Sequence, residues 1–308
     1  LQDLQGSTFY VCEAIDDFRS DVELGDLNKR GWVFQERALS RRTIYFTKTQ
    51  VYWECGKGVQ CETLTKMFNL KSSFLADPNF PQSAFSYYKG MRIRFFQNIY
   101  EQYSRLDFTI VTDRSAALAG LEERLARTYE THGSFGILER FLHRSLMWQR
   151  AGDAPMTKVR YSKDRNVPSW SWMAVEGPIQ YMDIPFDGVN WSEDIRSPFK
   201  QLVGVIGSQY DIAGDIDAIA RDLVLPLQGA DVQVVFDQPG GTQPRVLKCV
   251  VVAKEKVDRV TDLQKYYVLL VRSIRASQGS KEYERTGVAT VRRRHVSLNE
   301  GVVNVRIV

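Results

Sequence analysis

The sequence predicts an α+β protein in which helices precede strands along the chain. Apolar residues recur at helical spacing between residues 85 and 150, and from about residue 165 they alternate with polar residues at a period of two. The chain has 308 residues, of which 44% are hydrophobic, so it is long enough to bury a sizeable core. We expect three segments, 1–65, 66–165 and 166–308, with a helical middle and a largely antiparallel β C-terminal part.

The first segment predicts a helix followed by a hairpin. Residues 29–40 favour a helix that carries Trp32 and Glu36 four residues apart, on one face. In the following stretch, TIYFTKTQVYWEC, apolar and polar residues alternate on both sides of a TKTQ turn. We expect this hairpin to pack against the helix, because Trp32 and Trp53 both need an apolar partner of large area.

Three helices are predicted in the middle segment. The first two carry apolar stripes that indicate core packing. These stripes are Tyr87, Met91, Phe95, Ile99 and Tyr103, then Leu118, Leu121, Leu125 and Tyr129. Asp113 is the expected cap at the start of the second helix, and Gly133 its expected end. A third helix is expected to carry Ile137, Phe141 and Trp148.

The last segment predicts strands. Alternating or continuously apolar runs occur in ADVQVVF, RVLKCVVV, YYVLLVRSI and the terminal VVNVRIV. The stretch PSWSWMAV spaces Trp170 and Trp172 by two, which in a strand would put both on one face. We expect the pair in the core; exposure of the two rings would instead indicate an interface.

Charge and composition exclude several classes of protein. The 41 basic and 37 acidic residues are mixed along the chain, so nucleic acid is not expected as a partner, and VRRRH at 291–295 favours a solvated strand or loop. No stretch approaches the roughly 18 apolar residues of a membrane span, and the first residues lack the order of a secretory signal. We therefore expect a cytoplasmic protein without a membrane partner.

The motifs of common enzymes and metal sites are missing from the sequence. It contains no dinucleotide-binding, phosphate-loop or hydrolase-elbow signature. Four cysteines occur, at positions 12, 55, 61 and 249, without a repeated short spacing, which favours free thiols. No histidine lies close after Cys55 and Cys61, and the three histidines of the chain are far away, at positions 132, 143 and 295, so the sequence predicts no metal site.

Several blocks resemble one family. The stretch RGWVFQERALSRRTIYFTKTQVYWEC resembles the third conserved block of the fungal heterokaryon-incompatibility (HET) domain. Downstream, YSRLDFTIVTDRSAALAGLEERL, VPSWSWMAVEGPI, YERTGVA and VNVRIV are similar to segments of the same proteins. Two earlier blocks of the family are absent from this sequence, so residues 1–65 correspond to the C-terminal portion of the HET domain.

The resemblance implies a role and a chemistry. HET proteins trigger cell death when genetically different fungal cells fuse, and their domain is thought to be a distant relative of the TIR domain. Residues 1–65 would then be the remnant of a TIR-like α/β domain. Many TIR domains cleave NAD with a glutamate four residues after a tryptophan, which implies catalysis by Glu36 and substrate binding by Trp32, Arg30 and Arg37. NAD would be the substrate, and no cofactor is expected.

Two alternatives stay open from the sequence. Glu36 could pair with Arg37, Arg41 or backbone groups while Trp32 packs in the core, in which case both are structural. The protein could also be a non-enzymatic scaffold or regulatory module that binds a protein partner or self-associates. The chain as it stands, without the two earlier blocks, is expected to be inactive on NAD.

Overall fold

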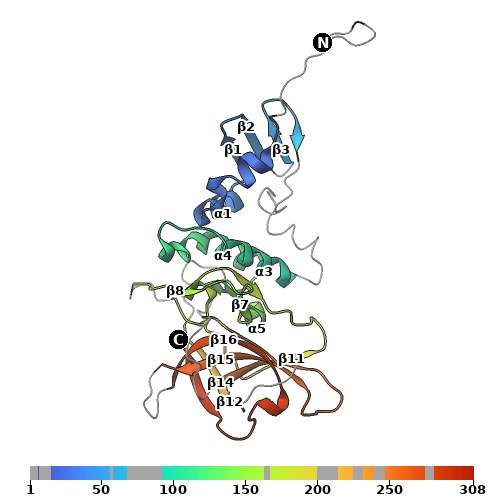
Figure 1. The fold of residues 1–308 in the computed structure, drawn as a ribbon, viewed down its shortest axis with the longest axis vertical. Helices are drawn as coiled ribbons and strands as arrows, with labels where there is room; N and C mark the ends of the chain where they lie inside the picture. Colours follow the sequence, from blue (N-terminus) through green and yellow to red (C-terminus); the bar gives the residue numbers. More distant parts are fainter. Residues whose placement is uncertain are drawn as a thin grey trace. The chain divides into compact units, whose positions relative to one another are not determined.

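The computed structural model describes residues 6, 15–55, 58–67, 92–162, 167–199, 214–224, 232–238, 247–274 and 281–308. The chain forms two units, Leu1–Tyr87 and Tyr88–Val308, each described by itself (Figure 1). Both contain helices and strands, which confirms the α+β class. The expected boundary near residue 165 falls inside the second unit, because strands on either side of it pair with each other.

The first unit contains a short helical stretch and a small sheet. Two single turns, η1 (Arg19–Glu23) and η2 (Asp26–Lys29), precede helix α1 (Gly31–Leu39). The sheet is antiparallel in the order β1 (Arg42–Phe46), β2 (Val51–Cys55), β3 (Gly58–Cys61) and β4 (Lys66–Met67). The β1–β2 pair confirms the predicted hairpin. One face of the sheet is buried, with Phe18, Val22, Tyr52, Val59 and Cys61 as its core.

The expected tryptophan packing between helix and hairpin is wrong. Trp32 and Trp53 are each 39% exposed. Helix α1 buries a different face, formed by Gly31, Phe34, Arg37 and Ala38. In β2 the buried positions are Tyr52 and Glu54, and Trp53 lies between them, so the alternation of a strand turns it to the other face.

Two of the three predicted helices are present in the second unit. They are α3 (Arg92–Tyr103) and α4 (Ala116–Thr128), and the leucines at 118, 121 and 125 are fully buried. Ser115, not Asp113, takes the N-cap position of α4, because Asp113 belongs to the turn η3 (Val111–Asp113). Residues Tyr87 and Met91 of the expected stripe lie outside the described residues.

The third predicted helix is wrong. Its region forms β5 (Gly133–Ser134), β6 (Ile137–Leu138), η4 (Glu139–Phe141), the four-residue helix α5 (Leu142–Ser145) and β7 (Trp148–Arg150). Gly133, the expected end of the second helix, lies in β5. The physical reason is Gly136, whose φ of +77° closes the β5–β6 hairpin in a conformation that a helix does not contain.

The β-rich part is built around a sheet that closes on itself. Its strands are β12 (Ile216–Asp222), β14 (Lys248–Glu255), β15 (Lys265–Ser273), β16 (Glu282–Arg292) and β17 (Val303–Ile307). Each pairs with the next, and β17 returns to β12; all pairs are antiparallel except β16 with β17. Strand β11 (Val189–Trp191) joins β14, and β13 (Gln233–Phe236) joins β16. The antiparallel prediction is confirmed, although β11, β12 and β16 were not expected.

Both faces of the central strands of this sheet are buried. One face, with Ala218, Val250, Leu269 and Val288, packs with residues between 137 and 199. The other face of β14, β15 and β16 carries a second cluster around Cys249, Val268 and Leu270. None of the helices in the described part of the chain combines the length and apolar character that a membrane crossing requires.

Trp170 and Trp172 are both fully buried, which confirms the prediction that they belong to the core. They do not share a strand face. Ser171 caps the turn η6 (Trp172–Ala174) by accepting a hydrogen bond from the Met173 N–H. This turn sends Trp172 against Tyr100 and Tyr103 of α3, while Trp170 packs with the closed sheet.

Two short sheets complete the second unit. In one, β7 pairs with β10 (Ile179–Tyr181), and in the other, β8 (Thr157–Lys158) pairs with β9 (Val175–Glu176). The chain also contains the turn η7 (Arg293–His295) within the basic stretch VRRRH.

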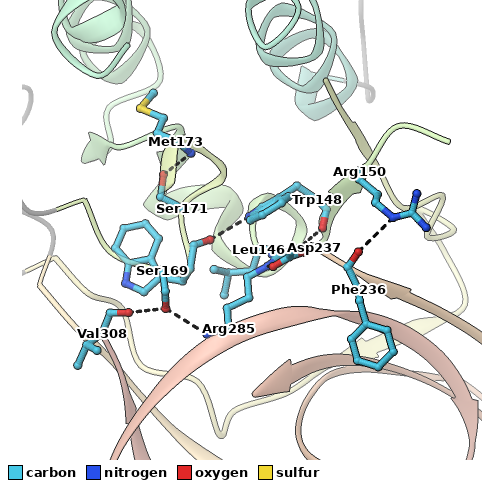
Figure 2. A network of polar contacts seen from close by, with 11 residues as sticks. Leu146, Trp148, Arg150, Ser169, Ser171, Met173, Phe236, Asp237, Arg285 and Val308 are labelled. Atoms are coloured by element: carbon cyan, nitrogen blue, oxygen red, sulfur yellow. Dashed lines mark hydrogen bonds and ion pairs between the residues drawn. The ribbon is translucent and has the colours of Figure 1, made fainter. Parts of the chain in front are cut away.

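A buried arginine, Arg285, joins the closed sheet to residues 146–148 (Figure 2). The Arg285 side chain, on β16, is fully buried and donates two hydrogen bonds to the Asp237 carboxylate at 3.0 and 3.1 Å. It also donates to the carbonyls of Leu146, at 2.6 Å, and Trp148. Its guanidinium lies 3.3 Å from the centre of the Trp148 ring. One side chain therefore connects the closed sheet to Leu146 and to the first residue of β7.

A buried carboxyl holds α4 against the β5–β6 turn. Glu122 is 5% exposed, and its Oε1 accepts a hydrogen bond of 2.5 Å from the Gly136 N–H. Burial raises the pKa of Glu122 to about 8, against the lowering effect of the hydrogen bond that it accepts from Gly136. Glu122 is therefore protonated at neutral pH.

We expect this carboxyl to make stability depend on pH. Because the pKa of Glu122 is raised in the folded state, its contribution is fully present below about pH 4.5 and is lost as the pH rises through about 8. Each pH unit in this window removes up to about 1.4 kcal/mol. Thermal midpoints should be measured from pH 4 to 9. As the pH rises, the midpoint of Glu122→Gln should increase relative to that of the wild type. Glu123→Gln, on the same helix, should show no such relative increase. Parallel pH profiles for the wild type and Glu122→Gln would contradict the raised pKa of Glu122.

Candidate functional site

Helix α1 has two faces with different roles. Its buried residues, Gly31, Phe34, Arg37 and Ala38, follow the three- and four-residue spacing of one helical face. Trp32 and Glu36 lie between them and are both exposed. Packing therefore explains the residue types on the buried face of RGWVFQERALS, but it does not explain those on the exposed face.

The buried half centres on an ion pair between Arg37 and Glu54. The Arg37 Nε and Nη2 donate to the two oxygens of Glu54 at 2.8 and 2.6 Å. Both side chains are buried, at 3% and 2% exposure. A two-point pair of this kind fixes both distance and orientation, so it sets how α1 lies on strand β2.

Aromatic rings enclose the Arg37 guanidinium. Phe18 and Tyr45 lie with their ring centres 5.7 and 5.9 Å from it, and the Tyr45 hydroxyl donates to Glu54 at 2.7 Å. Burial opposes the charge of Arg37, but hydrogen bonds and attraction from Glu54 outweigh it and raise the pKa of Arg37. Arg37 is therefore a charged structural residue whose guanidinium is occupied by Glu54, and it is not presented to a substrate.

The other predicted site residues lie at the surface. Arg30 is exposed immediately before the first residue of α1, Trp32 lies in the first turn at 39% exposure, and Glu36 follows one turn later. The Glu36 carboxylate has no hydrogen bond or ion pair within the part of the chain that the structure describes. The expected pairing with Arg37 does not occur, because Arg37 points to Glu54.

The hairpin leaves an apolar strip uncovered. Ile44 and Trp53 lie opposite each other in the β1–β2 register, and Phe46 is two residues along from Ile44, so all three share one face. They are 49%, 39% and 82% exposed, respectively. Helix α1 contacts the opposite face, which carries Glu54. The strip is therefore available for binding.

The two cysteines of this sheet cannot share a metal ion. Cys55 lies on the face of Trp53, whereas Cys61 pairs in register with Tyr52 and lies on the buried face. The Cys61 thiol instead donates to the carboxylate of Asp16 at 3.4 Å. In the described ranges, no group of three or more histidine, cysteine, aspartate or glutamate side chains is placed to hold a metal. Cys55, Cys61 and Cys249 are free thiols; Cys12 lies outside the described residues.

The sequence placed Trp32 and Glu36 on one face but did not indicate the partner of Arg37. Glu54 occupies a buried strand position between Trp53 and Cys55, and a charge there requires a buried partner of opposite sign. The alternation of the strand could have indicated that Glu54 is buried, but not which basic residue pairs with it. Comparison of the chain with protein-family models, with curated proteins and with solved structures finds no match.

Proposed function

We propose that this chain is the C-terminal part of a fungal HET protein, which acts in the cell death that follows fusion of genetically different cells. The resemblance of RGWVFQERALSRRTIYFTKTQVYWEC to the third HET block supports this proposal, as does the similarity downstream. The observation that carries it is the exposure of Trp32 and Glu36, which packing leaves unexplained. Arg37, Tyr45 and Glu54 of the same block are explained by the buried ion pair.

The chemistry proposed for this face is cleavage of NAD at its nicotinamide bond, in a complete HET domain. Departure of nicotinamide leaves positive charge on the ribose, which the Glu36 carboxylate would stabilise. Trp32, one turn earlier on the same face, would supply a flat apolar wall. Arg30, at the start of the helix, would contact the phosphates. Arg37 has no part in this scheme, because Glu54 holds it.

We expect Glu36→Gln, made in a complete HET protein, to abolish cell death and leave the thermal midpoint within a few degrees. The substitution removes the charge of an exposed side chain and keeps its shape. Asp26→Asn, which removes an exposed carboxylate from the same unit, is the control and should remain toxic. Because Trp32 is 39% exposed, Trp32→Ala should cost less than the roughly 3 to 5 kcal/mol of a buried tryptophan and should yield a folded, inactive protein.

Two results would contradict the catalytic role. A stable Glu36→Gln protein that remains fully toxic would show that the carboxylate is not needed. A Glu36→Gln protein that unfolds would assign the residue to structure. NAD consumption by purified wild-type and variant protein, measured beside the death assay, separates loss of chemistry from loss of signalling.

A second candidate function is a non-enzymatic interaction module, and the apolar strip of Ile44, Phe46 and Trp53 favours it. A phenylalanine that is 82% exposed beside two further large apolar side chains is typical of a binding surface. Under this alternative Phe46→Ser would abolish cell death and association with the partner, whereas Glu36→Gln would retain both. The two functions therefore predict opposite results for the same pair of variants.

A further inference from the structure

A cavity of about 550 Å³ lies in the second unit between the β7–β10 pair and the closed sheet. Strand β7 contacts both β13 and β16 there. Three glutamines line the cavity: Gln149 from β7, Gln180 from β10 and Gln233 from β13. No role has been assigned to any of them in the site described above.

Strand pairing brings these side chains together. Gln149 and Gln180 lie opposite each other in the β7–β10 register, so both amides project from one face. On the other side of the cavity, Gln233 lies opposite Thr290, and Thr290 lies opposite Tyr267. On one side of the cavity therefore lies the glutamine pair, and on the other a row formed by Gln233 on β13, Thr290 on β16 and Tyr267 on β15.

The unpaired side chain of Gln149 indicates that the cavity binds a ligand. It is only 7% exposed, and its Oε1 has no hydrogen-bond partner in the described residues. Buried amide oxygens are nearly always bonded, and leaving one unbonded is unfavourable. This oxygen is itself covered, and because Gln149 lines the cavity, a turn of its amide about the last side-chain bond presents the acceptor to a donor on a ligand.

The charges around the cavity indicate a neutral ligand. Lys265 and Asp183 contribute one charge of each sign to the lining; Arg94, which pairs with Asp183, is not a lining residue. An anionic ligand would need an excess of basic groups, which this lining does not have. The lining residues with the largest apolar surfaces are Tyr181, Met182 and Tyr267. All three are nearly buried, so they do not form the open slot that a stacked nucleobase requires.

Three carboxamides and a hydroxyl can each donate and accept hydrogen bonds, which matches adjacent hydroxyl groups on a small ring. The Thr290 hydroxyl donates to the Met182 sulfur at 3.6 Å, so its oxygen remains an acceptor. We propose that this cavity binds a neutral polyhydroxylated ligand of monosaccharide size, with Gln149 and Gln180 as hydrogen-bonding residues on one wall and Gln233 and Thr290 on the other.

Titration calorimetry of the full chain with glucose, galactose, mannose and N-acetylglucosamine tests the proposal. At least one sugar should bind one to one, with a dissociation constant of roughly 0.1 to 10 mM. Gln149→Met keeps the length of the side chain and removes its amide, so it should weaken binding at least about tenfold without lowering the thermal midpoint. Gln180→Met, at a partly exposed position that folding tolerates, should weaken binding as well. Gln60→Met, at an exposed glutamine of the first unit, is the matched control and should bind like the wild type.

Three outcomes would overturn the proposal. The folded wild type could bind none of the four sugars at 50 mM, or both cavity variants could bind as the wild type does. Adenosine or inorganic phosphate, titrated in parallel, could bind in place of the sugars and be displaced by no sugar. Any of these results would remove the assigned ligand class.

Discussion

Replacing Arg285 by methionine should lower the free energy of unfolding by about 3 to 5 kcal/mol. The substitution leaves the Asp237 carboxylate, 6% exposed, without its partner of opposite charge. It also removes the donors to the buried carbonyls of Leu146 and Trp148 (Figure 2). Denaturant unfolding of the purified chain measures the loss.

Arg272→Met is the matched control for this result. Arg272 lies on the neighbouring strand β15 and pairs with Glu284, but its side chain is 52% exposed. An exposed ion pair contributes about 1 kcal/mol or less. In the double variant Arg285→Met with Asp237→Leu, removing both charges should recover part of the stability lost in the single variant. Equal losses for the Arg272 and Arg285 variants would show that the buried network does not stabilise the fold.

Gly136→Ala should cost roughly 3 to 4 kcal/mol, from backbone strain and a clash together. Gly136 has a φ of +77°, which side chains with a Cβ rarely adopt. A Cβ there would lie 2.0 Å from the Nε1 atom of Trp172, whose ring is fully buried and cannot withdraw. Near-ultraviolet circular dichroism should show the displacement of this tryptophan, and denaturant unfolding should show the loss of stability.

Gly152→Ala separates the clash from the strain. Gly152 also has a positive φ, of +57°, but a Cβ there meets no atom within 4 Å. Its substitution should therefore cost only the strain, about 1 to 2 kcal/mol. If the two alanine variants lose equal stability, the contact between Gly136 and Trp172 is not the cause.

Half of the candidate site could be predicted from the sequence. Four-residue spacing in a helix places Trp32 and Glu36 on one face whatever the rest of the chain does. The buried face of α1 is set by contacts of Arg37 with Glu54, 17 residues later, and with Phe18. The contact with Glu54 forms only when the hairpin forms. No local pattern contains that information, so the sequence grouped Arg37 with the surface residues.

Elements with a strong pattern over many residues could be predicted from the sequence. Helices α3 and α4, the β1–β2 hairpin and strands β14, β15 and β17 follow from spacing, because burial of one face or of a whole strand imposes a period. The burial of Trp170 and Trp172 was also predictable, since large apolar rings favour the core.

How these elements combine depends on contacts that form only in the folded protein. Closure of the sheet depends on β16 reaching β17 at Glu282 and Tyr283, a pairing between strands that local alternation cannot specify. The same holds for the third predicted helix, which does not form. Gly136 turns the chain there, and the Trp148 Nε1–H donates a hydrogen bond to the Trp170 carbonyl. The glutamine-lined cavity arises from register across two sheets. In each case the deciding contacts join residues far apart in the chain, and their energies are gained only when the packed fold brings them together.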